Sequence, residues 1–277
     1  MKSNTKSSKI VLFTVLTILA ILFIMPIVVV LVNSFKGKLF ISTEPFAFPT
    51  AETFSGLENY INGIERTKFI SAFFCSLFIT IGATAGIILF TSMTAWYLTR
   101  VKGKVTSILY YIIIFSMIVP FQMVMFTMSK VANELTIDNP IGIILLYIGF
   151  GTGLSVFMYC GFVKTVPFEI EEAAMIDGCS PIKTFFLVVM PLLKPITTTI
   201  IILNVMWIWN DYLLPTLVLS DYRTIPMAVQ YLKGGYGSID MGAMMGVLVL
   251  AIIPIIVFYL TCQKHIIEGI AAGAVKG

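Results

Sequence analysis

Long apolar runs separated by short charged segments dominate the chain. Six of them cover residues 10–35, 69–99, 105–129, 139–163, 195–220 and 241–263. Only the fifth run contains a charged residue, Asp211. An α-helix rises 1.5 Å per residue, so about 20 apolar residues cross the roughly 30 Å hydrocarbon core of a bilayer. All six runs exceed that length, and the pattern predicts six transmembrane helices.

The runs are continuous and do not alternate between apolar and polar residues, which favours helices over the strands of a membrane barrel. Glycines and prolines inside them, such as Gly82, Pro120 and Pro254, predict close helix packing and bends, with a gating hinge as the alternative. The first run follows three lysines, as a signal peptide would, but it is too long for one and predicts an uncleaved first helix.

Composition excludes several classes of protein. The chain is 58% hydrophobic and 12% charged, whereas soluble domains carry about 25% charged residues. Its four cysteines have no CxxC spacing and it has one histidine, His265, so we expect neither a disulfide scaffold nor a metal site. We predict an all-α polytopic membrane protein that is not an enzyme, with no catalytic residue and no cofactor.

Positive charge sets the predicted orientation. Six helices place both termini on one side, and Arg100, Lys102 and Lys104 crowd a very short loop on that side. The positive-inside rule makes that side cytoplasmic. We therefore predict a cytoplasmic N-terminus (1–9) and a transmembrane domain (10–277) with external loops 36–68 and 221–240, a cytoplasmic loop 164–194 and a cytoplasmic tail 264–277. Loop 36–68 is expected to fold as a small cap. The net charge of +4 reflects this bias, not nucleic-acid binding.

The cytoplasmic loop 164–194 predicts two short helices. Pro167 suits the first position of one helix, with Glu169, Glu171 and Glu172 near its positive dipole end. Gly178 suits the position just after the helix end, where glycine adopts a positive φ at little cost. Ser180 and Pro181 then start a second helix that runs toward Met190 and Pro191.

The first loop helix is amphipathic. Ile170, Ala173, Ala174 and Asp177 share one side, and the two alanines leave room for a partner backbone. Such a helix suits docking into a groove of a cytosolic partner. A helix that lies on the membrane surface has a similar pattern. The residues alone leave both alternatives open.

A family resemblance rests on this loop. Glu172-Ala173-Ala174, then Gly178, then Val188-x-Met190-Pro191 resembles the EAA-x3-G-x9-I-x-L-P pattern of permease subunits of binding-protein-dependent ABC importers. The spacing is intact and both replacements are conservative. The resemblance implies a coupling helix that fits a cleft on an ATPase subunit. The implied coupling residues are Glu172, Ala173, Ala174, Asp177, Gly178 and Pro191.

The resemblance extends to the C-terminus. Trp209–Pro215 is similar to the fifth-helix segment of sugar-importing permeases, and the tail 268–277 is similar to that of the maltose-type subunit. In that family the tail reaches toward the ATPases, which implies a role for Gly273, Lys276 and Gly277. The implied partners are a second homologous permease subunit, two copies of a cytoplasmic ATPase and an extracytoplasmic sugar-binding protein. The implied location is a bacterial cell membrane, in contact with lipid.

The resemblance also implies that loop 221–240 faces the binding protein. The alternative is that this loop is only a mobile connector.

The sequence lacks the motifs of two possible energy sources for transport, ATP hydrolysis by this chain and proton coupling. No GxxxxGK[ST] string occurs, so ATP chemistry would be performed by another chain. A proton-coupled carrier places acids or histidines inside the bundle, and Asp211 alone qualifies. We predict an ATP-driven importer for a sugar, expected to be an oligosaccharide. The alternatives are an ABC importer for another solute, such as a glycerol phosphate ester, and an ion-coupled secondary transporter.

Polar residues form a stripe on the predicted fifth helix. Asn204, Trp207 and Asp211 share one face, and Asn210 is adjacent. We interpret them as a translocation path in which amides and a carboxylate bind sugar hydroxyls and the indole packs on the sugar ring. Helix–helix hydrogen bonding is the alternative. Tyr147 and Tyr159 in the fourth run are expected mainly to pack.

Overall fold

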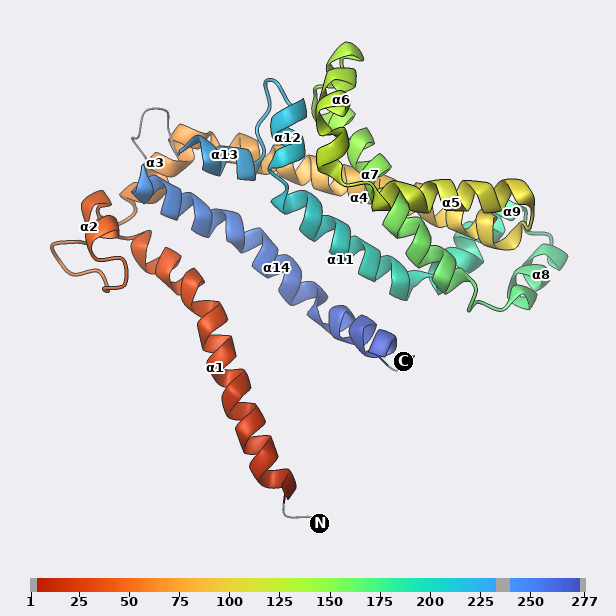
Figure 1. Ribbon diagram of the computed structural model, residues 1–277, viewed down its shortest axis with the longest axis horizontal. Coiled ribbons are helices and arrows are strands. Elements are labelled where there is room, and N and C mark those ends of the chain that lie inside the picture. The colour runs from red at the N-terminus through yellow and green to blue at the C-terminus, as the bar shows by residue number, and fades with distance from the viewer. Residues whose placement is uncertain (1–3, 233–239, 275–277) are drawn as a thin grey trace. The chain divides into compact units, whose positions relative to one another are not determined.

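The computed structural model describes residues 4–232 and 240–274, and describes side chains within 8–232 and 240–264 (Figure 1). The chain divides into two compact units. Unit 1 comprises Met1–Ile70 and Ala228–Pro254, and unit 2 comprises Ser71–Met227 and Ile255–Gly277. Within the described residues all named elements are helical, which confirms the predicted all-α class.

The helices follow in this order: α1 (Asn4–Asn33), α2 (Lys38–Thr43), α3 (Glu58–Thr67), α4 (Phe69–Arg100), α5 (Lys104–Ile118), α6 (Phe121–Glu134), α7 (Pro140–Val163), α8 (Phe168–Ile176), α9 (Pro181–Thr184), a π-helical segment (Phe185–Val189), α10 (Met190–Leu192), α11 (Lys194–Asn210), α12 (Leu213–Val218), α13 (Ile225–Tyr231) and α14 (Met241–Ala274).

Within 4–232 and 240–274, four helical stretches are long and apolar enough to cross a membrane: Ser8–Asn33, Phe69–Arg100, Pro140–Val163 and Met241–Lys264. Two further pairs pass only when each is taken together. Lys104–Ile118 and Phe121–Glu134 meet at 101°, and Pro181–Leu192 and Lys194–Asn210 meet at 77°. The number of spans is six if each bent pair is one span, so the count of six stays a prediction.

The third apolar run is bent at Pro120, as predicted for a proline inside a run, and the bend of 101° divides it into two helices. Val119 and Pro120 are extended, with ψ of 116° and 133°. A proline has no N–H to donate, and it pushes the residue before it out of the helical region. Pro120 therefore ends α5, and α6 leaves in a new direction (Figure 1).

The fifth apolar run also differs from the prediction. Its helix α11 ends at Asn210, and Asp211 has extended backbone with ψ of 124°. The Asp211 Oδ1 atom accepts hydrogen bonds from the backbone N–H of Leu213 at 2.9 Å and of Leu214 at 3.4 Å. Such local side-chain bonds compete with the helical ladder. Asp211 therefore separates α11 from the short helix α12 and does not lie inside a single span.

The core of unit 2 forms around α7. This helix packs against α5 and α11, and α6 packs against α12. Tyr147 and Tyr159 of α7 are fully buried, and the Tyr159 hydroxyl donates to Thr197 Oγ1 at 2.9 Å. A Cβ added to Gly151 would collide with Ile87 of α4, so the small residue lets the two helices approach, as predicted for glycines in these runs.

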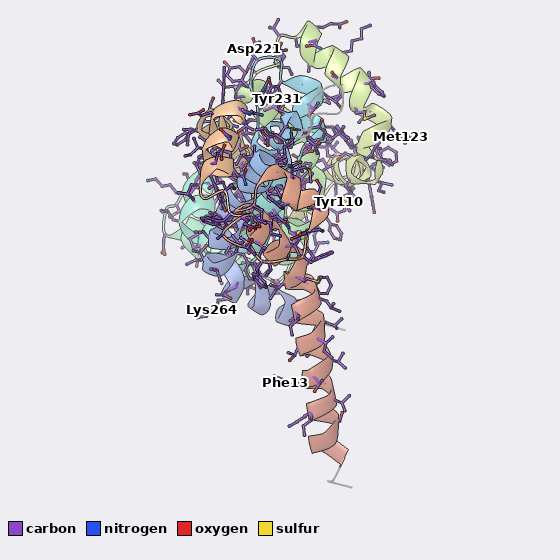
Figure 2. All side chains as sticks on the ribbon, turned by 90° about the vertical axis from the view of Figure 1, so that its left-hand side faces the viewer. Phe13, Tyr110, Met123, Asp221, Tyr231 and Lys264 are labelled. Carbon is purple, nitrogen blue, oxygen red and sulfur yellow. The ribbon has the colours of Figure 1, made fainter. Side chains whose placement is uncertain are left out.

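The outer surfaces of the long helices are apolar. Within Ser8–Asn33 the most apolar window has none of its residues buried, and Phe13 projects from α1 into the surroundings (Figure 2). A helix that is apolar all round and exposed suits a membrane and not water.

Loop 36–68, which was predicted to lie outside the cell, is folded. Lys36 is buried, and its ammonium donates to the carbonyl of Glu44 at 2.7 Å. The Asn59 amide donates to the carbonyls of Ser34 and Lys36 at 2.9 and 2.8 Å. These bonds satisfy buried polar groups that would otherwise destabilise the loop.

Candidate functional site

The first loop helix, α8, ends in a tight corner. Gly178 has φ of +85°, which confirms the predicted positive φ. The N–H of Cys179 donates to the carbonyl of Ala174 at 3.0 Å, and that of Gly178 to Met175 at 3.0 Å. These two bonds define a Schellman motif, which satisfies carbonyls at a helix end. The helix begins at Phe168, one residue later than predicted, because Pro167 has a ψ of 132°, outside the helical region.

The second loop helix begins as predicted. The Ser180 hydroxyl accepts from the N–H of Lys183 at 3.4 Å, and Pro181 occupies the first helical position. The helical line continues through the π-helical segment Phe185–Val189 into Met190–Leu192. Pro191 has no N–H for an ordinary helical bond, and a widened π-helical segment is one way in which a helix accommodates such a loss.

The residues of the EAA pattern are accessible on this helix pair. Glu172, Ala173, Asp177, Gly178 and Pro191 are exposed, and Ala174 is half-buried. Large apolar side chains lie on the same two helices and are also exposed: Ile176, Ile182 and Leu187 at 86%, 65% and 68%. Contiguous exposed apolar surface marks a binding site for a protein or a membrane. The geometry of this chain is compatible with both alternatives.

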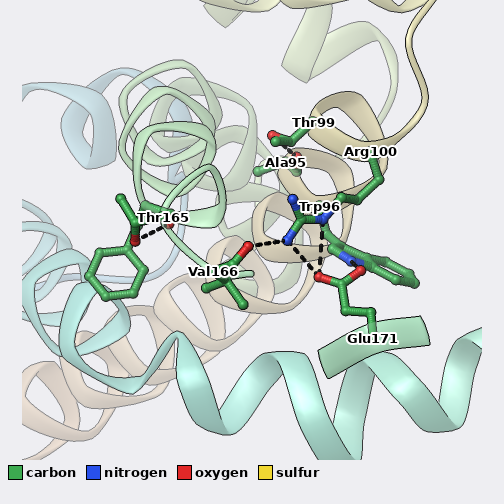
Figure 3. Close-up of polar contacts among 8 residues, drawn as sticks. Ala95, Trp96, Thr99, Arg100, Thr165, Val166 and Glu171 are labelled. Atoms are coloured by element: carbon green, nitrogen blue, oxygen red, sulfur yellow. Dashed lines mark hydrogen bonds and ion pairs between the residues drawn. The ribbon is translucent and has the colours of Figure 1, made fainter. Parts of the chain in front are cut away.

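One side chain of α8, that of Glu171, points into the protein and not toward the surroundings. Glu171 is fully buried and pairs with Arg100 at the end of α4 (Figure 3). Its Oε1 accepts from Arg100 Nη2 at 2.7 Å and Nε at 3.0 Å, and its Oε2 accepts from Trp96 Nε1 at 2.9 Å. Arg100 Nη2 also donates to the carbonyl of Val166 at 2.8 Å.

Sequence reasoning missed this contact. It assigned Glu171 only to the dipole of the helix and Arg100 only to the basic loop. No spacing rule links residues this far apart along the chain. The one signal available was charge complementarity between a basic loop and an acidic one, both predicted on the cytoplasmic side.

The predicted path residues separate into two groups. Trp207, 41% exposed, meets the ring of Tyr147 edge-on, with centroids 5.4 Å apart. The Tyr147 hydroxyl donates to Asp211 Oδ2 at 3.0 Å. The structure thus brings Trp207 and Asp211 to one tyrosine, which has a polar contact beyond the packing role expected of it.

Asn204 and Asn210 behave differently. Asn204 is buried, and its amide donates to the carbonyl of Ile200 at 2.8 Å and to Ser155 Oγ at 3.5 Å. Asn210 is exposed, but its amide donates back to the carbonyl of Met206 at 2.7 Å. The contacts of Asn204 fit the helix–helix alternative, because it bridges α11 and α7.

Other predicted residues lie near or beyond the ends of the described chain. Gly273 lies in α14. Lys276 and Gly277 lie outside the described residues, as do residues 233–239 of loop 221–240. For these the sequence interpretation stays a prediction.

Comparison with known proteins gives consistent results. Residues 86–271 match the family described as "Binding-protein-dependent transport system inner membrane component". The chain is 39% identical to the probable starch degradation products transport system permease protein AmyC of Thermoanaerobacterium thermosulfurigenes, over 94% of each chain. It is 34% identical to the multiple sugar-binding transport system permease protein MsmG of Streptococcus mutans, over 100% of each.

A solved structure shares the fold. One chain of a bacterial ABC transporter involved in the import of the acidic polysaccharide alginate matches with a TM-score of 0.79 at 23% identity. The match covers 95% of this chain and 98% of that one. The family match of residues 86–271 includes the helix pair α8–α9 and the polar face of α11.

Proposed function

The chain belongs to the family of binding-protein-dependent transport system inner membrane components, and on that premise we propose that it is one permease subunit of an ATP-driven importer for an oligosaccharide. Membership makes it a multi-pass membrane protein that works with a partner permease, an ATPase and a solute-binding protein. The finer assignment is one homologous permease partner, two ATPase copies and an extracytoplasmic sugar-binding protein. Both termini are cytoplasmic in a bacterial cell membrane.

The observation that carries the proposal is the α8–α9 corner. The EAA spacing falls on a short helix whose small residues are accessible and whose end is fixed by Gly178. Exposed apolar side chains beside Ala173 suit the groove of a protein. The coupling residues are Glu172, Ala173, Ala174, Asp177, Gly178 and Pro191. The tail residues Gly273, Lys276 and Gly277 complete the ATPase contact.

The oligosaccharide assignment is supported by the relatives. Their names refer to starch degradation products, to multiple sugars and to melibiose, raffinose and stachyose. Sugars have apolar C–H faces and many hydroxyls, and an accessible indole and a carboxylate that both contact Tyr147 suit such ligands.

Within this chain we assign the translocation path to Trp207 and Asp211, held by Tyr147, with Asn204 and Asn210 on the same helix. Trp207 is accessible enough to pack against a sugar ring. One oxygen of Asp211 is fixed by Tyr147, which orients the carboxylate for hydroxyl donors. Asn204 acts as a spacer between α7 and α11, since its amide already donates hydrogen bonds to Ile200 and Ser155 of this chain.

Reconstituted transport tests the energy source. The permease pair, ATPase and binding protein are placed in proteoliposomes with a labelled malto-oligosaccharide. We expect uptake to require ATP and to survive collapse of the proton gradient. Uptake driven by an imposed pH gradient without the ATPase would instead establish a secondary transporter.

Side-chain variants test the path. Trp207→Ala and Asp211→Asn are expected to reduce uptake while the complex assembles normally. Ile202→Ala is the control: Ile202 lies on the opposite face of the same helix from Trp207, so this variant should transport normally. Equal loss of assembly and uptake in the two path variants would give these residues a structural role.

A further inference from the structure

Glu171 is a buried acid on a helix whose neighbouring acids are exposed. Glu169 and Glu172 of α8 face the surroundings, whereas the Glu171 side chain has no exposed surface. A buried carboxylate is costly unless it is paired and hydrogen-bonded. Both oxygens of Glu171 are satisfied, by three donor atoms from Arg100 and Trp96 of α4.

The contact extends beyond one ion pair. Trp96 and Arg100 are four residues apart, so they share a face at the end of α4. Arg100 also donates to the carbonyl of Val166, just before α8, and its guanidinium lies 5.5 Å from the ring centre of Phe168. The Trp96 ring packs on Phe185 of the second loop helix with centroids 5.4 Å apart. The last turn of α4 therefore touches both helices of the loop.

We propose that Glu171 is a positioning residue that fastens the coupling helix to α4, so that a displacement of α8 is transmitted to the membrane-spanning part of the chain. The proposal rests on the proposed function, in which α8 docks on an ATPase. Two donors of one guanidinium bind Oε1 and the Trp96 N–H binds Oε2, and these charge-assisted bonds from two sides fix the direction of the carboxylate as well as its distance. Apolar contacts alone would let the short helix slide.

The path from α4 to the transport site is continuous. A Cβ added to Gly82 or Gly151 would collide with Ile144 of α7 or Ile87 of α4, so these helices are in close contact. Tyr147 of α7 in turn donates to Asp211. Physical contact along such a route is necessary for coupling, and only a coupling measurement demonstrates it.

The test uses the complete importer in proteoliposomes, with three measurements on each variant: capture of the ATPase by the permease pair, ATP hydrolysis stimulated by loaded binding protein, and sugar transported per ATP. Glu171→Gln keeps the side-chain shape but removes the charge that compensates Arg100. Trp96→Phe removes one donor and keeps an aromatic ring against Phe185. Glu169→Gln makes the same chemical change at an exposed position of α8 and is the control.

We expect Glu171→Gln to capture the ATPase normally while sugar transported per ATP falls by at least about fivefold, the lower end of ordinary coupling between two sites. In Trp96→Phe the amount of sugar transported per ATP should also fall, but by less. In Glu169→Gln it should be unchanged. A purely structural role would lower the amount of assembled complex without changing the ratio of sugar to ATP.

Two results would overturn the proposal: an unchanged ratio in Glu171→Gln, or a parallel loss of ATPase capture and transport at constant ratio. If Glu171→Gln does not assemble, Trp96→Phe decides, because an unchanged ratio there also overturns it. Ala173→Trp tests the underlying function separately. If that bulky variant still captures the ATPase and transports sugar, the docking assignment of α8 fails, whatever Glu171 does.

Discussion

Replacing Gly178 by alanine tests the corner of the proposed coupling loop with a single added carbon. At this position φ is +85°, a conformation that L-residues rarely adopt. A Cβ built on Gly178 meets nothing within 4 Å. Contact with other residues of this chain therefore adds no penalty, and the effect on the conformation of the loop comes from the backbone. Left-handed backbone costs a residue with a Cβ roughly 1–2 kcal/mol.

That magnitude predicts a graded series. A change of 1–2 kcal/mol shifts an equilibrium by about 5–30-fold, which sets the largest loss of ATPase affinity expected for Gly178→Ala. Asparagine is larger than alanine but tolerates the left-handed region better, so Gly178→Asn should bind more tightly than Gly178→Ala. Valine is β-branched and tolerates this backbone conformation least, so Gly178→Val should bind the ATPase most weakly.

The assay is a titration of the ATPase subunit against the purified permease pair. Gly161→Ala is the matched control, because it adds the same carbon at a helical glycine of α7 where a Cβ also meets nothing. Equal binding by wild type and Gly178→Val would show that the corner is not needed for docking. Weaker binding by the asparagine variant than by the alanine variant would refute backbone strain as the cause.

Three further substitutions test packing and local structure through the midpoint of thermal unfolding of the purified complex. Asn139→Ala removes the side chain that caps α7, which accepts from two backbone N–H groups at 3.0 Å, and should destabilise by about 0.5–2 kcal/mol. Gly151→Ala forces a Cβ against Ile87 and should destabilise by about 1–3 kcal/mol, with no loss if α4 and α7 are not in contact. Arg66→Ala breaks an exposed pair with Asp240 and should change stability by less than about 1 kcal/mol; a larger loss would contradict its surface character.

Local rules predicted the two short helices of loop 164–194 well. The end of α8 at Gly178 and the start of α9 at Ser180 and Pro181 depend on residues within one turn, and each was assigned from the sequence. The positions of the apolar runs were equally predictable, because a bilayer demands length and apolarity before any tertiary contact forms.

Long-range contacts were beyond such rules. Pro120 predicted a bend, but the size of that bend, 101°, depends on how the neighbouring helices pack. The Glu171–Arg100 pair and the Tyr147–Asp211 bond join residues 71 and 64 positions apart. Their partners follow from how helices pack, and one sequence without that packing does not specify them.

Asp211 shows why a path residue should be probed with more than one substitution. Its Oδ1 accepts the N–H groups that start α12, and its Oδ2 accepts the Tyr147 hydroxyl. Asparagine keeps one oxygen acceptor, so it can preserve the local turn while it removes the charge. Alanine removes both the charge and the feature that ends α11. A transport loss shared by both variants would be due to the charge, whereas a loss in Asp211→Ala alone would be due to the break between the two helices.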